Sequence, residues 1–486
     1  MSTLRKILIA LLVILVLLAG FGWYMTRGQT AELTMDQVSG TDPKLADPSP
    51  ENFPTVGIAD PVGWGADQVP AAAQGLAVTR FADGLDHPRV VYTLPNGDVL
   101  VALTNRPPAS DPGGITGWFM RTFLDKAGAG DASPNQIVLL RDANGDGKAD
   151  VKQVLRSDLS SPSGMAWRDG TLYVADHDAL LAFKYQPGEM AISGTPEKLM
   201  DLPPAGNHWM RNIIISPDGK QIYVAVGSSS NIGENGMDKE EGRAAIWEYD
   251  IAKKRQRLYA SGLRNPNGLA WSPMSGELWT TVNERDMLGG DLVPDYLTNV
   301  PVGAQYGWPW VYWGDTFDRR VEAPVPAYLT EYARKPEFAL GPHVAALGLV
   351  FTQGGSMLGE KFSHGAIIAR HGSWNRKPPS GYDVVYVAFD DLGNPVGKPV
   401  PLLTGFLEDG GKTHGRPTWV AWAGDGALLV SDDTAGIIWR VVAPGAAPAQ
   451  AMKPLTGTSL PPRTELNGDS QAAFGPEDYA RVEPVN

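Results

Sequence analysis

The sequence predicts an all-β protein, a six-bladed β-propeller with an N-terminal transmembrane helix. Two observations predict the propeller. The chain of 486 residues contains 56 Gly and 40 Pro, which favours short strands joined by tight turns over a helical bundle. In addition, one pattern recurs six times between residues 76 and 442: an apolar strand, a glycine turn and a second strand of alternating apolar residues. A sandwich would not explain one hairpin repeated over a whole domain, whereas each copy can begin a propeller blade.

The six hairpins set the expected blades. The spacing between their turns is uneven, so loops of different length must separate the strands, and such loops commonly carry function. The hairpins are 90–102, 164–176, 212–227, 268–283, 348–371 and 419–432.

The chain opens with an apolar segment. Ile7 to Met25 carries no charge, and nineteen helical residues at ~1.5 Å each span ~28 Å, close to the hydrocarbon thickness of a bilayer. Arg5 and Lys6 precede this segment, so the positive-inside rule predicts a cytoplasmic N-terminus. We expect residues 1–29 to be an uncleaved anchor in the inner (plasma) membrane, with the large domain on the periplasmic side. A cleaved signal peptide is the alternative.

Composition shifts divide the rest of the chain. Residues 30–75 are rich in Pro, Asp and Gly and are predicted to be an extended linker, and the propeller occupies residues 76–442. A tail rich in Pro and Ala follows over residues 443–486. Aromatic and aliphatic residues at 118–124 are expected to pack as an excursion of the first blade, with a patch facing a membrane as the alternative.

Charge and cysteine content exclude several classes of protein. The net charge of −13 argues against a nucleic-acid binder. The chain has no Cys, which excludes disulfides, cysteine zinc sites, iron–sulfur clusters, a covalently attached c-type haem and a cysteine nucleophile. The motifs of zinc proteases, Rossmann dehydrogenases, Walker NTPases and serine hydrolases are also absent from the sequence. Any redox chemistry therefore needs a non-covalent cofactor.

Polar loops next to the hairpins offer candidate ligands. His208 precedes the third hairpin, Arg264 the fourth and Arg416 the sixth, while Arg376 follows the fifth. Loops at equivalent blade positions converge in a propeller, so these cations could surround one anionic ligand. The alternative is that each forms a salt bridge on its own loop. Separately, the alternating oxygen ligands of Asp142–Asp150 suit either a structural calcium or an Asx-rich turn.

Several ordered motifs extend this pattern. Together they resemble the pyrroloquinoline quinone (PQQ)-dependent sugar dehydrogenases, particularly the aldose and sorbosone dehydrogenase branch. The motifs are Gly206-Asn207-His208-Trp209, Val226-Gly227-Ser228, Gly262-Leu263-Arg264-Asn265-Pro266-Asn267-Gly268, Tyr306-Gly307-Trp308-Pro309 and His371-Gly372-Ser373-Trp374-Asn375-Arg376.

The resemblance implies roles for individual residues. His208 matches the family's general base, which removes the hydroxyl proton from the anomeric carbon as hydride passes to the quinone. Arg264 and Asn265 match the pair that binds the quinone oxygens.

Further residues match cofactor and metal positions less closely. Arg416 matches the second arginine of an R-x-R motif that contacts cofactor carboxylates, and His414 replaces the first. Arg376 is the candidate to replace a cofactor-binding lysine. Glu284 and Arg285 occupy the loop whose backbone carbonyls hold the cofactor's calcium.

The implied function is PQQ- and calcium-dependent oxidation of an aldose or a related, sorbosone-like sugar. The electrons would pass to a respiratory quinone or cytochrome. Two alternatives remain open: a calcium-dependent sugar lactonase, for which Asn283 and Glu284 are the candidate ligands, and a non-enzymatic binding propeller. The family's Gln is absent near Ser161 and its Lys is absent near Ser373, which favours the non-enzymatic binding propeller.

Overall fold

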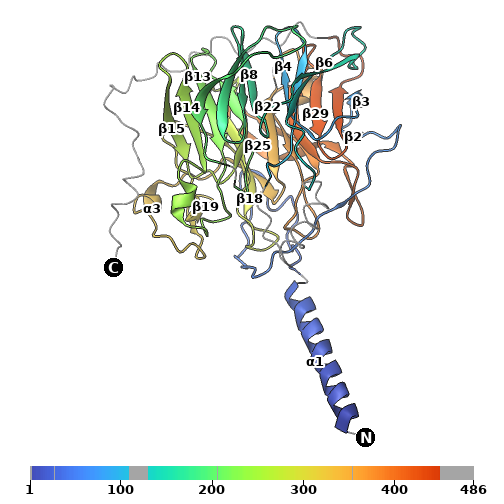
Figure 1. Ribbon diagram of the computed structural model, residues 1–486, viewed down its shortest axis with the longest axis vertical. Coiled ribbons are helices and arrows are strands. Elements are labelled where there is room, and N and C mark those ends of the chain that lie inside the picture. Colours follow the sequence, from blue (N-terminus) through green and yellow to red (C-terminus); the bar gives the residue numbers. More distant parts are fainter. Residues whose placement is uncertain (1–2, 27, 109–129, 205, 353, 449–486) are drawn as a thin grey trace.

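The computed structural model describes residues 3–26, 28–108, 130–204, 206–352 and 354–448. The apolar residues predicted to pack at 118–124, and the tail beyond residue 448, lie outside this part of the chain. Apart from one long helix at the N-terminal end, the regular structure of the described part consists mainly of β-strands (Figure 1).

Six antiparallel sheets make up the body of the protein, and each consists of four consecutive strands or nearly so. The first sheet contains β4 (Pro88–Thr93), β5 (Val99–Leu103), β6 (Gln136–Arg141) and β7 (Val151–Arg156), and the second β8 (Met165–Arg168), β9 (Thr171–Ala175), β10 (Ala179–Lys184) and β11 (Glu197–Asp201). The third contains β12 (Ile213–Ile215), β13 (Gln221–Val226), β14 (Ala245–Asp250) and β15 (Arg255–Ser261), and the fourth β16 (Pro266–Trp271), β17 (Leu278–Val282), β18 (Pro294–Asn299) and β21 (Phe338–Pro342). The fifth contains β22 (Ala346–Phe351), β23 (Gly365–Arg370), β24 (Asp383–Phe389), β25 (Pro395–Thr404) and β2 (Ala71–Ala72), and the sixth β28 (Pro417–Trp422), β29 (Leu428–Asp432), β30 (Ile437–Val442) and β3 (Ala77–Ala82).

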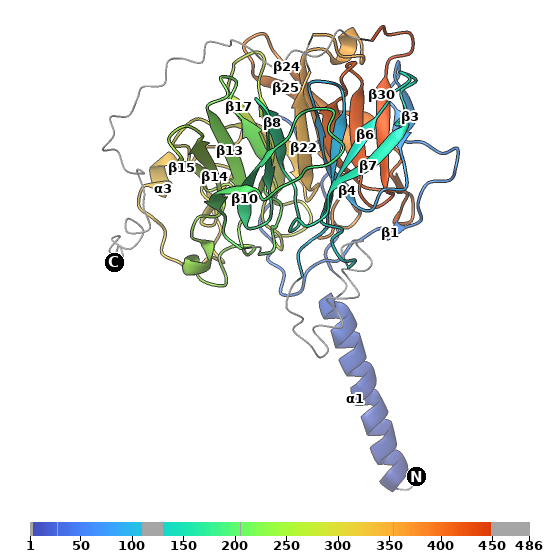
Figure 2. The ribbon, with the colours of Figure 1, turned by 45° about the horizontal axis from the view of Figure 1, so that its top comes forward.

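The innermost strands close into a ring. β4, β8, β12, β16, β22 and β28 each contact the next, and β28 contacts β4 again. The sixth sheet joins the two ends of the domain, because β3 pairs with β30 from Ala77 opposite Val442 to Ala82 opposite Ile438. The sheets therefore surround one axis as the blades of a propeller (Figure 2).

Burial explains the sequence pattern of the blades. Every residue of β5 and of β13 is buried, because inner strands are covered by a neighbouring blade on each face. Each of the six predicted hairpins forms the first two strands of one sheet. The predicted all-β, six-bladed propeller is thus observed.

The remaining elements are short. β27 (Lys412–Thr413) pairs with β1 (Asp60–Pro61) and with β26 (Leu407–Glu408), and β19 (Val311–Tyr312) pairs with β20 (Thr316–Phe317). The short helices are α3 (Leu329–Tyr332) and the 3₁₀ helices η1 (Met237–Glu240) and η2 (Glu360–Phe362).

The N-terminal membrane anchor is not supported. A membrane span needs about 20 consecutive apolar residues in one helix. Among the residues that the structure describes, no helix, α1 (Thr3–Thr26) included, combines the length and the apolar character that crossing a membrane requires. The predicted single-pass anchor over residues 1–29, and the inner-membrane location that rested on it, are therefore wrong.

The segment predicted as a linker lies against the propeller. We call residues 28–61 the N-terminal strap. Val38 and Thr55 are fully buried, and Gly40 forms a β-bridge with Ala339 of β21. Backbone hydrogen bonds join the strap to loops of the fourth and fifth blades, which its polar composition did not indicate.

Candidate functional site

The propeller gathers the predicted site residues at one end. Each inner strand begins at this end and each second strand finishes there, because the two strands of a hairpin are antiparallel. His208 lies shortly before β12, Arg264 and Asn265 immediately before β16, and Arg416 immediately before β28. The polar loops of several blades therefore share one face.

Hydrogen bonds fix the tautomer of His208. Its Nδ1 lies 2.9 Å from the carbonyl oxygen and 3.0 Å from the Oγ of Ser228. The Ser228 hydroxyl donates its own proton to the carbonyl of Ser230 at 2.7 Å, so both groups facing Nδ1 are acceptors. The imidazole proton therefore sits on Nδ1. Within the described part of the chain, Nε2 has no hydrogen-bond partner.

The surroundings also keep His208 neutral. Burial, followed by the charge of Arg264, lowers its pKa from the ordinary 6.5 to about 3. The imidazole is thus unprotonated at Nε2 near neutral pH and able to accept a proton there.

Arg264 is held in one orientation by acceptors from two loops. It is 4% exposed. Its guanidinium donates to the carbonyl oxygen of Asn231 at 3.1 Å and to the Oδ1 of the same residue at 2.9 Å. It also donates to the carbonyl of Glu284 at 2.6 Å and to Oδ2 of Asp286 at 3.0 Å. Asp286 therefore joins the site from the loop after β17.

A glycine allows His208 and Asn265 to meet. A Cβ on Gly227 would lie 2.3 Å from Oδ1 of Asn265 and 2.6 Å from Cβ of His208. Asn265 in turn donates to Oδ1 of Asn283 at 3.1 Å. The three predicted residues His208, Arg264 and Asn265 are thus brought together around Gly227.

A second charged cluster surrounds Asp433. Its carboxylate lies 2.6 Å from Nη1 of Arg89 and 3.0 Å from Nε2 of His371. Arg416 donates to the carbonyls of His371 at 3.1 Å and Gly372 at 3.0 Å. Burial, then the charge of Arg416, lowers the pKa of His371 to about 4.

Sequence reasoning missed Arg89 and Asp433. They stand 344 residues apart, and only closure of the ring makes them neighbours. A signal was nevertheless available, because Arg89 directly precedes the first predicted hairpin and Asp433 directly follows the sixth. The Arg89 guanidinium also lies 5.4 Å from the centre of the Trp209 ring, so it links this cluster to the loop of His208.

Two predicted cofactor ligands point elsewhere. His414 stacks on Trp64 with ring centres 4.7 Å apart and contacts Glu408 at 2.8 Å. Arg376 is buried and pairs with Asp291 at 3.3 Å. The structure therefore brings Arg416 to the site but places His414 and Arg376 against segments of the N-terminal region.

The predicted calcium loop has its own internal partners. The side chain of Arg285 is fully buried and lies 2.9 Å from the carboxylate of Glu284. The Glu284 carbonyl accepts a hydrogen bond from Arg264, and the carbonyls of Asp286 and Met287 accept hydrogen bonds from Arg320. In the observed arrangement the carbonyl oxygens of this loop accept hydrogen bonds from guanidinium groups, and the loop does not form an open cation cradle.

Other candidate metal ligands are also engaged. The carboxylates of Asp142 and Asp150 accept backbone N–H groups of their own turn, at 2.7–3.2 Å. Across the described ranges, no group of three or more His, Asp or Glu side chains is arranged to hold a metal ion.

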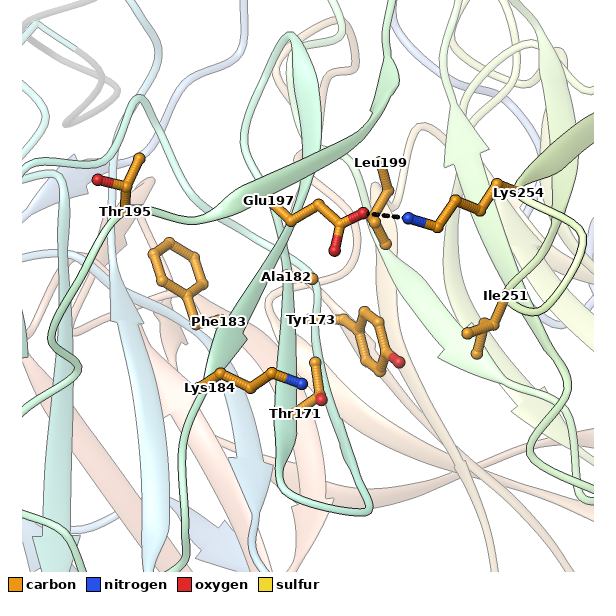
Figure 3. Close-up of a pocket in the computed structure, with 10 residues that line it drawn as sticks. All are labelled: Thr171, Tyr173, Ala182, Phe183, Lys184, Thr195, Glu197, Leu199, Ile251 and Lys254. Carbon is orange, nitrogen blue, oxygen red and sulfur yellow. Dashed lines mark hydrogen bonds and ion pairs between the residues drawn. The ribbon is translucent and has the colours of Figure 1, made fainter.

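A cavity of about 370 Å³ lies at the other end of the second blade. Glu197 and Lys254 form an ion pair across it, and Thr171, the first residue of β9, belongs to its lining (Figure 3). Because β9 runs from this cavity toward the site face, the cavity is separate from the His208 site.

A known protein family matches more than half of the chain. The profile of the TrAA12-like family matches residues 135–299 and 326–443, which include His208, Arg264, Asn265 and Arg416. The chain belongs to the TrAA12-like family. The predicted resemblance to PQQ-dependent sugar dehydrogenases is thereby confirmed.

Relatives of this TrAA12-like protein include a PQQ-dependent pyranose dehydrogenase of Coprinopsis cinerea. The two are 26% identical over 431 residues, covering 76% of this chain and 54% of the relative. The chain thus spans about half the length of that protein.

Solved structures show the same fold. An iodide structure of the Trichoderma reesei carbohydrate-active enzyme family AA12 has a TM-score of 0.63 at 20% identity, covering 78% of this chain and 100% of that one. The holo PQQ domain of the Coprinopsis cinerea pyranose dehydrogenase has a TM-score of 0.60 at 21% identity, covering 79% and 100%.

Proposed function

We propose that this TrAA12-like protein is a PQQ-dependent dehydrogenase that oxidises an aldose or a related sugar at its anomeric carbon. The observation that carries the proposal is the state of His208. Its Nδ1 donates its proton to Ser228, its side chain lies next to Asn265 at Gly227, and the nearby charge of Arg264 helps burial to lower its pKa, so that Nε2 is unprotonated. A neutral imidazole in this position suits a general base.

The polar groups of the site face fit PQQ. The cofactor carries three carboxylates and adjacent quinone oxygens, so it needs several cations and amide donors on one face. Arg264 and Asn265 would hold the quinone end, and Arg416 with Arg89 the carboxylates. The Nε of Arg89 is buried without a hydrogen-bond partner in the described structure, and such a donor is satisfied by a bound anion or water.

The remaining chemistry belongs to side chains of this chain. PQQ, when bound, supplies the two-electron acceptor that receives the hydride from the sugar carbon. His208 takes the hydroxyl proton at Nε2, so the sugar loses one proton and one hydride and becomes the lactone. Arg264 stabilises negative charge that develops beside it. Asp286 can stabilise the resulting imidazolium because the pKa of its own carboxyl is lowered. Burial alone would raise that pKa, but Arg264 and His343 more than offset the effect of burial.

The loop after β17 does not fit the calcium ion that the family resemblance implies. A calcium ion at the Glu284 carbonyl would compete with the hydrogen bond that Arg264 donates to it. We infer that electrons leave to a separate respiratory quinone or cytochrome, since a chain without Cys carries no covalently attached c-type haem. Sorbosone-like sugars are the first substrates to test.

The test uses the full chain. PQQ is titrated with and without calcium, binding is followed by absorbance, and reduction of an artificial dye is measured with a panel of aldoses and sorbosone. We expect dye reduction that depends on PQQ and is lost in His208→Ala, while that variant still binds PQQ. Failure of the wild-type chain to bind PQQ, or full activity of His208→Ala, would contradict the proposal.

A further inference from the structure

A segment of three consecutive serines contacts His208 on the Nδ1 side of its imidazole ring. Ser228, Ser229 and Ser230 connect the end of β13 to the loop that leads into η1, and Ser228 and Ser230 are fully buried. Ser228 presents its carbonyl and hydroxyl oxygens to Nδ1 of His208. The position of this segment therefore decides where the imidazole points.

The serine segment also joins the two main parts of the site. The backbone N–H of Ser228 donates to the carbonyl of Arg264 at 2.7 Å, and the carbonyl of Ser229 accepts the N–H of Asn207 at 2.9 Å. Asn207 is the neighbour of His208 in the chain. A shift of the segment would thus move both the base and the backbone of the quinone-binding arginine.

One buried carboxylate holds the serine segment. Glu240, the last residue of η1, is 5% exposed. Its Oε2 accepts the N–H of Ser229 at 2.7 Å and its Oε1 accepts the hydroxyl of Ser230 at 2.5 Å. The carboxylate of Glu234 also interacts with the hydroxyl of Ser230, but Glu240 is the carboxylate that binds Ser229 and Ser230 together. Hydrogen bonds to an ionised acceptor are about twice as strong as neutral ones.

We propose that Glu240 is a positioning residue for His208, which acts through Ser228 to fix the imidazole in the Nδ1–H tautomer. By binding Ser229 and Ser230, the carboxylate sets the turn in which both Ser228 oxygens face Nδ1. Nε2 is left unprotonated and directed away from the turn. The catalytic consequence rests on the proposed function, whereas the tautomer does not.

Glu240→Gln tests the role without changing the size of the side chain. An amide has only one oxygen, so its NH₂ group must face either the Ser229 N–H or the Ser230 hydroxyl. We expect the turn to loosen and the proton to be shared between Nδ1 and Nε2. Misplacement of a catalytic group by about 1 Å costs roughly 100-fold in rate, so we expect kcat to fall roughly 10- to 100-fold with little change in KM.

Two measurements check this. ¹⁵N NMR of the apo protein, with the His208 signals assigned from His208→Gln, reports the tautomer, and steady-state kinetics of the PQQ-loaded chain report kcat and KM. Glu248→Gln is the matched control, because Glu248 is a buried carboxylate of the same blade that binds Arg257 and Tyr223 instead. The control should keep the Nδ1–H tautomer and the wild-type kcat.

The outcomes separate this inference from the proposed function. A changed tautomer in Glu240→Gln supports the positioning role even where no sugar is oxidised. A wild-type tautomer in a folded Glu240→Gln protein overturns the role, whatever the activity. If Glu240→Gln does not fold, Glu240→Asp takes its place, because its carboxylate is one methylene shorter and cannot reach both Ser229 and Ser230. The tautomer of His208 should then change, and a wild-type tautomer in the folded variant would again overturn the role.

Discussion

Arg264 and Asp286 form an ion pair in which Nη2 of the guanidinium lies 3.0 Å from Oδ2 of the carboxylate. Both side chains are largely buried, and the second carboxylate oxygen lies 3.3 Å from Nδ1 of His343. The cation expected to bind the quinone oxygens is therefore already partly neutralised. Asp286 must influence two properties in opposite directions, since it weakens the pull of Arg264 on an anion but stabilises a positive charge on His208.

Replacing Asp286 with Asn should separate cofactor binding from turnover. Without the carboxylate, Arg264 has one negative partner fewer, so PQQ affinity should stay equal to that of the wild type or increase. The imidazolium of His208 loses a stabilising charge, and we expect kcat to fall about 10-fold. PQQ titration and single-turnover dye reduction measure the two effects. Weaker PQQ binding together with an unchanged kcat would show that Asp286 acts in another way.

The pKa of His208 predicts a specific dependence of stability on pH. Its folded-state pKa is about 3 against an ordinary 6.5, so between these values the unfolded chain binds a proton that the folded chain does not. The contribution of His208 is complete above about pH 6.5 and is lost as the pH falls toward 3. Because the side chain is only partly buried, we expect about 1–3 kcal/mol for this contribution.

His208→Gln isolates that contribution from the other titrating groups. Urea unfolding at pH 4, 5, 6.5 and 8 should give a steeper loss of unfolding free energy for the wild type than for the variant. In addition, kcat of the wild type for dye reduction should not fall between pH 8 and pH 5 through protonation of His208. Parallel stability curves for the two proteins would mean that His208 titrates near its ordinary pKa.

Gly227→Ala should damage the site while leaving the fold intact. The added methyl would meet Oδ1 of Asn265 and Cβ of His208 at distances that real Cβ atoms do not tolerate, so one of them must move. We expect kcat/KM to fall roughly 100-fold with native circular dichroism. Gly354→Ala is the control, because a Cβ there meets no atom within 4 Å. Equal activity of the two variants would contradict the predicted contact.

The sequence predicted the propeller because its signal is local and repeated. Each inner hairpin reads as apolar strand, glycine turn and apolar strand, so the repeat survives loops of uneven length. His208 and the pair Arg264 and Asn265 stand shortly before two of these hairpins, so their place on one face of the propeller could be expected from the topology. Their roles remain predictions that rest on the family resemblance.

The other contacts depend on pairings that no local pattern encodes. Asp433 and Arg89 become neighbours only when β3 closes the ring on β30. The N-terminal strap has no strand or helix periodicity, so the full burial of Val38 and Thr55 could not be inferred from its composition. Arg376, which the resemblance assigns to the cofactor, instead pairs with Asp291 and donates to the carbonyl of Leu33 in the strap.

The contact between Asp291 and the strap gives a last prediction. Oδ2 of Asp291 accepts the N–H groups of Glu32 at 2.6 Å and Leu33 at 3.0 Å, while Oδ1 pairs with Arg376. Asp291→Ala removes these acceptors and leaves the buried guanidinium of Arg376 without its carboxylate. Breaking a buried ion pair on one side costs about 3–5 kcal/mol, so we expect a lower unfolding free energy and faster proteolysis within residues 28–61. Mass spectrometry of the fragments locates the cuts, and Glu197→Gln, which breaks the exposed ion pair with Lys254, should change neither property.

PQQ affinity distinguishes the two roles of Arg376. If the residue only holds the strap, Asp291→Ala and Arg376→Ala should bind PQQ equally well, whereas a weaker affinity confined to Arg376→Ala would return this arginine to the cofactor site.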